Sequence, residues 1–309
     1  MARAAAASAE RKRIDTHLHL WTPDAERYPA SKPIPENLNS DRRGTFESFV
    51  KLMDETGISQ AVVIQPINYG QDYRYLMAAM SAYPTRLKGM FIADPSVPSE
   101  DAAAWVRATA ASSPGWVGIR FNPYLWPASA EGGMADSTGK AMFAAAGDLG
   151  LVIGFMAFKG LKLHVADIEA LLQDSPKTKV IIDHWGFFLQ PATGEGDRVI
   201  DEDSWNALLQ LSKYPQVYVK VSALFRAAAD AYPWPSLSDR LAVLLKTYSS
   251  SRLMWGSDFP FVTDFAEYGP AARAPEAWPV WGDMSEQERD DLFFNTAAGL
   301  LSGQCSESR

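Results

Sequence analysis

Three of the four histidines in this 309-residue chain stand at the ends of short apolar runs, where a side chain can leave a buried strand. His17 and His19 are two residues apart in the run RIDTHLHL, so an extended strand points both to the same face. His184 directly follows the apolar run VIID. Paired imidazoles can bind a metal, polarise a carbonyl group or relay protons. A lone histidine is more often a buried residue bonded to the backbone, but the pair favours a chemical role.

A carboxylate ends the last apolar run of the chain. Asp258 stands in the sequence GSDFP, just before an aromatic–proline turn. Beside a histidine that holds its charge and position, such an aspartate can act as a general base toward water. The structural alternative is an aspartate that caps a turn or a helix. We expect Asp15 to lie below the first-strand histidines on the same face. We expect Asp183 to point between strand and helix in a structural role, and Trp185 to wall a pocket.

Basic and aromatic side chains follow two other runs. Arg120 ends the run WVGIR, and a guanidinium there suits a substrate carboxylate, although a structural ion pair is the alternative. Arg226, just past VYVKVSAL, is a second candidate for substrate binding. Lys220 alternates with valines, so it points either into a pocket or outward beside a helix. Tyr124 and Trp126 either line the pocket or pack in a loop.

Eight β-rich runs must position these side chains, and helical patterns separate them. Several runs are continuously apolar, as in parallel strands covered on both faces. The run 236–248 and the capping-box sequence SEQE at 285–288 are typical of helices. Further helices are expected at 45–53, 167–172 and 204–211. The expected strands cover residues 13–20, 61–66, 87–94, 116–122, 151–156, 179–184, 217–223 and 252–258.

Eight parallel strands can close into a barrel, so we predict an α/β fold of the (β/α)8 or TIM-barrel type. An open doubly wound sheet is the alternative, but no glycine-rich phosphate loop follows an early strand. We expect a single domain over residues 13–302, with flexible tails at 1–12 and 303–309. Catalytic groups of such barrels lie at the C-terminal ends of the strands, where the candidates above fall. Residues 21–45 and 262–284 are expected to shape the mouth.

Charge and composition narrow the partners. The net charge of −8 argues against a nucleic-acid partner, and the tight basic cluster at 11–13 is interpreted as a solvated approach to the first strand. No apolar stretch approaches the roughly 18 residues of a membrane span. Cys305 is the single cysteine, so an internal disulfide is impossible. We expect a small-molecule substrate and a cytoplasmic location. The short Ala- and Arg-rich N-terminus leaves organellar targeting open, and a homo-oligomer also stays open.

The runs at residues 14–21, 118–122, 180–186, 217–223 and 254–260 together resemble the amidohydrolase-2 family of the amidohydrolase superfamily. They read IDTHLHLW, GIRFN, VIIDHWG, VYVKVSA and MWGSDFP. The combination is specific and spans about residues 13–302. The chain is most similar to the lactonase-like branch, which includes 2-pyrone-4,6-dicarboxylate hydrolase and sugar-lactone hydrolases. The resemblance implies a hydrolase with functional residues on strands one, six and eight, namely His17, His19, His184 and Asp258.

One departure from the family concerns the metal. Metal-dependent members usually add a strand-five histidine, and many have a strand-four lysine or glutamate. Here strand five reads LVIGFM, strand four offers Arg120, and His164 falls at the expected start of a helix. An arginine repels a divalent cation, and thioether or phenyl groups are poor ligands. We therefore expect catalysis without a cofactor. The alternative is one divalent metal such as zinc, held by His17, His19, His184 and Asp258.

The reaction expected from these residues is hydrolysis of a lactone or similar cyclic ester that bears a carboxylate. Asp258 would take a proton from the attacking water, and Arg120 would fix the substrate, since lactonase-like relatives use arginines on carboxylated substrates. The three histidines would donate hydrogen bonds to the developing oxyanion. One alternative is a metal-dependent decarboxylase of the same family. The other is a non-catalytic barrel that binds a small acid, which scattered side chains would favour.

Overall fold

The chain folds around a ring of eight parallel strands in the order β1-β2-β3-β4-β5-β6-β9-β10. The computed structural model describes residues 11–34, 38, 44–127, 132–191 and 198–301. Each predicted strand is present: β1 Arg13–Leu18, β2 Ile58–Ile64, β3 Leu87–Ile92, β4 Trp116–Phe121, β5 Val152–Phe155, β6 Val180–Ile182, β9 Val217–Ser222 and β10 Leu253–Gly256.

The first and last strands meet and complete the ring. Leu18 forms a parallel bridge with Phe259, and the backbone N–H of His19 donates to the carbonyl of Phe259 at 2.8 Å. The N–H of Asp258 donates to the carbonyl of His17 at the same distance. The predicted TIM barrel is therefore confirmed. Its closure brings the histidines of the first motif, His17 and His19, next to Asp258 of the last motif.

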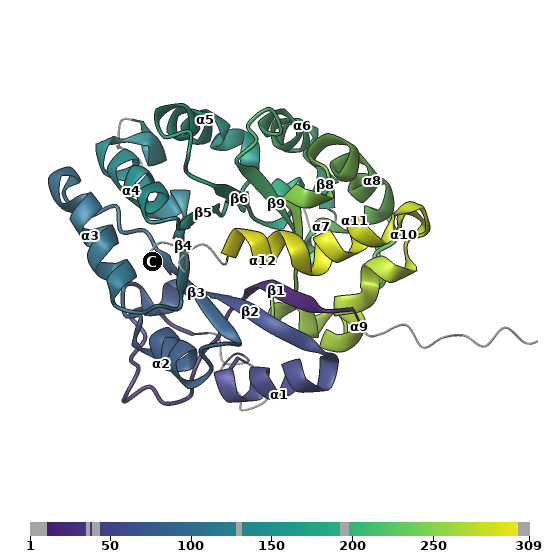
Figure 1. Cartoon of the computed structure of the whole chain (residues 1–309), viewed down its shortest axis with the longest axis horizontal. Helices are drawn as coiled ribbons and strands as arrows, with labels where there is room; N and C mark the ends of the chain where they lie inside the picture. The colour runs from purple at the N-terminus through teal and green to yellow at the C-terminus, as the bar shows by residue number, and fades with distance from the viewer. Residues whose placement is uncertain (1–10, 35–37, 39–43, 128–131, 192–197, 302–309) are drawn as a thin grey trace, which may run out of the picture.

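Helices surround the strands, as Figure 1 shows. Thr45 caps the first of them by accepting a hydrogen bond from the N–H of Ser48, and Ser285 and Glu288 form the predicted capping box. The longer helices are α1 Phe46–Thr56, α2 Arg74–Ala82, α3 Ser99–Ala111, α4 Ser137–Asp148, α5 Val165–Asp174, α6 Glu202–Leu211 and α8 Leu237–Tyr248. Short helices are α7 Leu224–Ala227, α9 Tyr268–Arg273, α10 Pro279–Asp283, α11 Glu286–Asp290 and α12 Thr296–Leu301.

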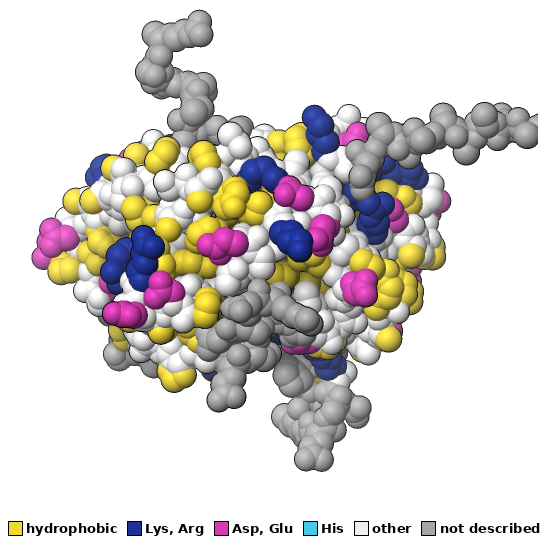
Figure 2. All heavy atoms as spheres, turned by 90° about the horizontal axis from the view of Figure 1, so that it is seen from below, with side chains coloured by type: hydrophobic (Ala, Val, Ile, Leu, Met, Phe, Trp, Pro, Cys, Tyr) yellow, Lys and Arg dark blue, Asp and Glu magenta, His cyan; other side chains and the backbone are white. Residues whose placement is uncertain are grey.

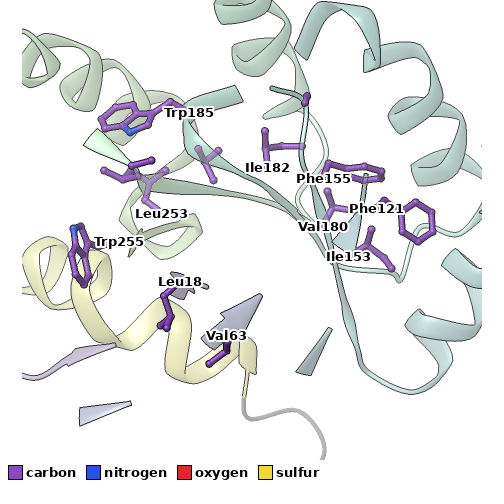
Figure 3. Close-up of a cluster of buried hydrophobic side chains, with 14 of the residues drawn as sticks. Leu18, Val63, Phe121, Ile153, Phe155, Val180, Ile182, Trp185, Leu253 and Trp255 are labelled. Carbon is purple, nitrogen blue, oxygen red and sulfur yellow. The ribbon is translucent and has the colours of Figure 1, made fainter. Parts of the chain in front are cut away.

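Two apolar layers hold the barrel together. The larger one lies between strands and helices, and Figure 3 shows part of it, including Trp185 and Trp255. A smaller cluster fills the barrel interior, where Met90 occupies the room that Gly118 and Gly154 leave. An added Cβ at Gly118 would lie 2.8 Å from the Met90 methyl carbon. Full burial of each large side chain contributes about 1.5–3 kcal/mol, so this packing fixes the strand positions.

The C-terminal helices cover one end of the barrel. Figure 1 shows α11 and α12 crossing the middle of the ring. Ala297 and Leu300 of α12 pack against Ile14 and Val117, which stand near the N-terminal ends of their strands. The opposite end, where the strands finish, is thereby left to the connecting loops.

Three features differ from the sequence predictions. A short hairpin of β7 Leu189–Pro191 and β8 Arg198–Ile200 was not predicted. The basic cluster at residues 11–13 is not simply solvated, because Arg13 is buried and pairs with Glu276. Trp185 packs in the layer between strands and helices and does not line the cavity beside His184.

On the face in Figure 2, basic and acidic side chains lie interspersed among apolar ones. Within the described part of the chain, no helix combines the length and the apolar content that a membrane crossing requires. Residues 1–10 and 302–309 lie outside the described residues, and with them most of the predicted N-terminal tail, all of the predicted C-terminal tail and Cys305.

Candidate active site

A shift in strand register separates Asp15 from the histidines that follow it. The pairing of β1 with β2 shifts between Asp15 and Leu18. Asp15 accepts hydrogen bonds from the N–H of Ser257 at 2.9 Å and from the hydroxyl of Tyr268 at 2.9 Å. The expectation that Asp15 lies below the histidine pair is therefore wrong, because the bulge turns it away. Burial raises the pKa of Asp15 to about 6.

The tautomer of His19 follows from its backbone contact. Its Nδ1 lies 3.0 Å from the carbonyl oxygen of Ile64, which can only accept, so Nδ1 carries the proton. Burial lowers the pKa of His19 to about 3, so the ring is neutral at physiological pH. Its Nε2 therefore presents a lone pair, 3.6 Å from Asp258 Oδ1. This tautomer revises the hydrogen-bond donor role that the sequence predicted for His19.

His17 has the opposite arrangement. Lys220 Nζ lies 3.1 Å from His17 Nδ1 and 3.1 Å from Asp183 Oδ1. An ammonium group only donates, so Nδ1 accepts and a neutral His17 carries its proton on Nε2. Burial and the charge of Lys220 hold the pKa of His17 well below its usual value. His17 Nε2 lies 4.0 Å from Asp258 Oδ1, too far for a hydrogen bond, and has no hydrogen-bond partner among the described residues.

Asp183 and Lys220 form a buried charge cluster under the histidines. Lys220 points into the barrel, which settles the two orientations that the sequence left open. Asp183 also lies 3.5 Å from an Nη of Arg120, so the expectation that it points between strand and helix is wrong. Burial alone would raise the pKa of Asp183, but Lys220 and Arg120 hold it below the usual value. The carboxylate is thus ionised and fixes both cations.

A left-handed turn after β6 presents His184 to the mouth. His184, Trp185 and Phe187 have φ values of 49°, 57° and 52°, which cost of order 1–3 kcal/mol each in non-glycine residues. His184 Nδ1 lies 2.8 Å from the Ser222 hydroxyl. Burial lowers the pKa of His184 well below its usual value, so this imidazole is also neutral. Its ring centroid lies 4.3 Å from that of His17.

Asp258 takes a left-handed conformation at the end of β10, with φ 62°. Its Oδ2 accepts a hydrogen bond from Nε of Arg226 at 2.8 Å, so Oδ1 is the oxygen that faces His17 and His19. Burial raises the pKa of Asp258, and the cation of Arg226 opposes that shift. The Arg226 guanidinium lies over the rings of Phe225 and Phe261 at 4.9 and 5.0 Å.

A cavity of about 390 Å³ opens above these groups. This volume is within the range of small-molecule sites. Its described lining contains no residue of 262–284, although that segment was expected to shape the mouth. Segment 21–45 does contribute, through Trp21, Pro33 and Leu38. The polar lining residues are His19, Asn68, Arg120, His184, Arg226 and Asp258.

Tyr124, Trp126 and His164 lie outside that lining, and so do His17 and Lys220, which are fully buried. Tyr124 packs against Phe158, and its hydroxyl accepts a hydrogen bond from the N–H of Lys159 at 2.8 Å. Trp126 is buried against Phe121. His164 stands at the start of α5, with Nε2 3.3 Å from the Tyr124 hydroxyl. Tyr124 is therefore placed behind the cavity wall, where it supports Phe158.

The donor set can hold one divalent ion. Ligand atoms of His17, His19 and Asp258 lie within 4.8 Å of one another. Nitrogen and carboxylate donors suit zinc, and the lone pair of His19 Nε2 faces the carboxylate. His184, which the sequence also placed in this set, does not belong to the group. A metal on His17 Nε2 would require the proton to move to Nδ1, which would end the hydrogen bond from Lys220.

Known proteins with similar sequences are lactone hydrolases. The amidohydrolase family model Amidohydro_2 matches residues 14–302. The chain is 26% identical over 282 residues to L-fucono-1,5-lactonase of Burkholderia ambifaria, covering 87% of this chain and 86% of the relative. It is 26% identical over 251 residues to 4-sulfomuconolactone hydrolase of Hydrogenophaga intermedia, covering 80% and 74%.

Solved structures share the fold. A Pseudomonas putida protein assigned as a 2-pyrone-4,6-dicarboxylic acid hydrolase superposes with a TM-score of 0.72 at 23% identity, covering 96% of this chain and 100% of that one. A zinc-bound amidohydrolase from Burkholderia multivorans superposes with a TM-score of 0.69 at 21% identity, covering 94% and 99%. At these identities the likeness concerns the barrel alone.

Proposed function

This chain belongs to the amidohydrolase family, and from its site we propose that it hydrolyses a lactone or similar cyclic ester that bears a carboxylate. The observation that carries the proposal is the position of Asp258 Oδ1, 3.6 Å from His19 Nε2 and 4.0 Å from His17 Nε2. Asp258 lines a cavity whose lining also includes Arg120 and Arg226. The curated relatives act on lactones, which supports the same reaction class.

The charges around the site favour an anionic substrate. Arg120, Lys220 and Arg226 carry three positive charges, and Asp183 and Asp258 carry two negative ones. One positive charge is left over, and the Arg120 guanidinium lines the cavity. A planar guanidinium binds a carboxylate through parallel hydrogen bonds. Lys220 is fully buried under His17, so we assign it to positioning that ring and not to direct substrate contact.

The two histidine tautomers suit different steps. Lone pairs on Asp258 Oδ1 and His19 Nε2 can accept the two hydrogens of a water molecule. Asp258 takes the proton as this water attacks the lactone carbonyl. The Nε2–H of His17 then donates to the oxygen where negative charge develops. When the ring C–O bond breaks, Asp258 returns the proton to the leaving oxygen, which becomes the hydroxyl of the hydroxy acid. His184 lies beside His17 and is a second donor if its Nδ1 accepts from Ser222.

A metal ion would be bound by some of the same residues. His17, His19 and Asp258 would hold it, and it would polarise the carbonyl group and acidify bound water. The metal-dependent decarboxylase has no observation of its own in its favour. The non-catalytic binder is disfavoured because the imidazoles and the carboxylate converge.

A lactone panel tests this proposal. Purified protein is assayed at fixed pH on carboxylated and neutral lactones, with and without a chelator. We expect ring opening of a carboxylated lactone and persistence of the rate after chelation. Release of carbon dioxide from a carboxylated substrate, with every lactone left intact, would contradict the proposal.

A further inference from the structure

We propose that the substrate has an apolar body, aromatic or alkyl, with one carboxylate, and is not a polyhydroxylated sugar lactone. This inference rests on the proposed function and specifies its substrate class. It follows from the walls of the cavity and not from the residues that carry out the reaction.

One wall consists of aromatic rings beside His19. The rings of Trp21 and Phe261 lie 5.9 Å apart and nearly perpendicular. Both flank the His19 imidazole, with centroid distances of 5.7 and 6.0 Å. Both rings therefore line the same cavity as His19 and Asp258. A flat or alkyl group bound above the reacting carbonyl would meet ring faces and edges.

Further apolar side chains line the cavity, and two of them are partly open to solvent. Phe187 lies edge-on to His184, with centroids 5.0 Å apart. Phe158 is 45% exposed and Ile67 is 37% exposed, although both line the cavity. Large apolar side chains left in contact with water at a cavity mark a surface that a ligand or partner covers. An apolar ligand would remove this surface from water, whereas a hydroxylated ring would not compensate for its own lost hydration.

The polar groups of the described lining are already engaged, except for those N–H groups of Arg120 and Arg226 that do not face Asp183 or Asp258. The side-chain oxygen of Asn68 accepts from the indole N–H of Trp21 at 3.2 Å, and its amide group donates to the carbonyl of Pro33 at 2.6 Å. His19, His184 and Asp258 are assigned to the reaction. Arg120 and Arg226 remain for the substrate, and both can only donate. The free donors thus match a carboxylate, whereas several sugar hydroxyls would find few free acceptors among the lining side chains.

Binding of paired non-hydrolysable probes tests the substrate class. The probes are two δ-lactam carboxylates of the same ring size, one bearing a phenyl group and one bearing three hydroxyls. We expect calorimetry to give at least tenfold tighter binding of the phenyl probe to the wild-type protein. Equal binding, tighter binding of the hydroxylated probe, or binding of neither probe would overturn the inference.

A rim substitution provides the matched control. Ile67→Thr keeps the β-branch at a partly exposed position, so folding is preserved, and we expect it to weaken binding of the phenyl probe severalfold. Leu163→Thr, at a 59% exposed site outside the lining, should change neither probe. Turnover of the corresponding lactones is measured separately. Tight phenyl-probe binding without any lactone turnover would remove the hydrolase proposal and leave the apolar specificity standing.

Discussion

Lys220 Nζ lies 3.1 Å from His17 Nδ1, and this contact decides which nitrogen of His17 faces Asp258 as a donor. The same lysine pairs with Asp183, so the ammonium group is held in place from below. Two histidines two residues apart in one strand thereby carry their protons on different nitrogens. Ile64 holds the proton of His19 on Nδ1, and Lys220 leaves that of His17 on Nε2.

Lys220→Met should remove the contact that keeps the proton of His17 on Nε2. His17 could then donate from Nδ1 to Asp183, 3.4 Å away, and lose the Nε2–H. Loss of one oxyanion donor costs about 10²–10³ in kcat, so we expect a fall of that size with a smaller change in KM. Zinc affinity, measured by competition with a chromophoric chelator, should rise. Because a buried pair is broken, circular dichroism must first show a folded protein. Lys179→Met, at an exposed position, is the matched control; unchanged kcat in Lys220→Met would remove the tautomer argument.

Asp15 should make stability depend on pH. Its pKa in the folded protein is about 6, against 3.8 as the ordinary value, so the folded state keeps a proton that the unfolded state has lost. Its contribution is therefore greatest below pH 3.8 and declines by about 3 kcal/mol as the pH rises to 6. In Asp15→Asn this decline should be absent. Urea unfolding between pH 4 and 7 measures the difference, and parallel curves for the two proteins would show that Asp15 stays ionised.

Arg226 should set the acid limb of the activity profile. Asp258 must be ionised to accept a proton, so kcat/KM falls as the pH drops through its pKa. Burial raises that pKa and the Arg226 cation opposes the rise. Arg226→Gln should therefore move the acid limb to higher pH, while Arg107→Gln on the surface of α3 should not. Because burial lowers the pKa values of the three site histidines, we expect no further change in kcat/KM near pH 6.5. If the acid limb of kcat/KM does not move in Arg226→Gln, that limb reports the titration of a group other than Asp258.

For the candidate site residues, the sequence predicted the place in the barrel better than the contacts of each side chain. His17, His19, His184 and Asp258 were found because strand alternation and the barrel rule place them at strand ends. The β-bulge that turns Asp15 away breaks that alternation, and no local signal in the sequence announces it.

Long-range pairing was also beyond sequence reasoning. Lys220 and His17 are 203 residues apart, so spacing could leave only two orientations open for the lysine. The left-handed run that begins at His184 sends Trp185 into the core and brings Phe187 to the cavity. The periodic pattern of apolar residues does not predict that Trp185 is buried while Phe187 lines the cavity. The apolar character of the cavity wall therefore emerged only from the folded chain.

The central claim is that Asp258 activates water in a site that binds a carboxylated lactone. Asp258→Asn keeps the size of the side chain and removes its basic oxygen, and Asp239→Asn on α8 is the matched control. Single-turnover rates and calorimetric binding of a carboxylated lactam should be measured on the same preparations. We expect the turnover of Asp258→Asn to fall at least 10³-fold while lactam binding changes less than tenfold. An Asp258→Asn protein that keeps most of its turnover would contradict the account.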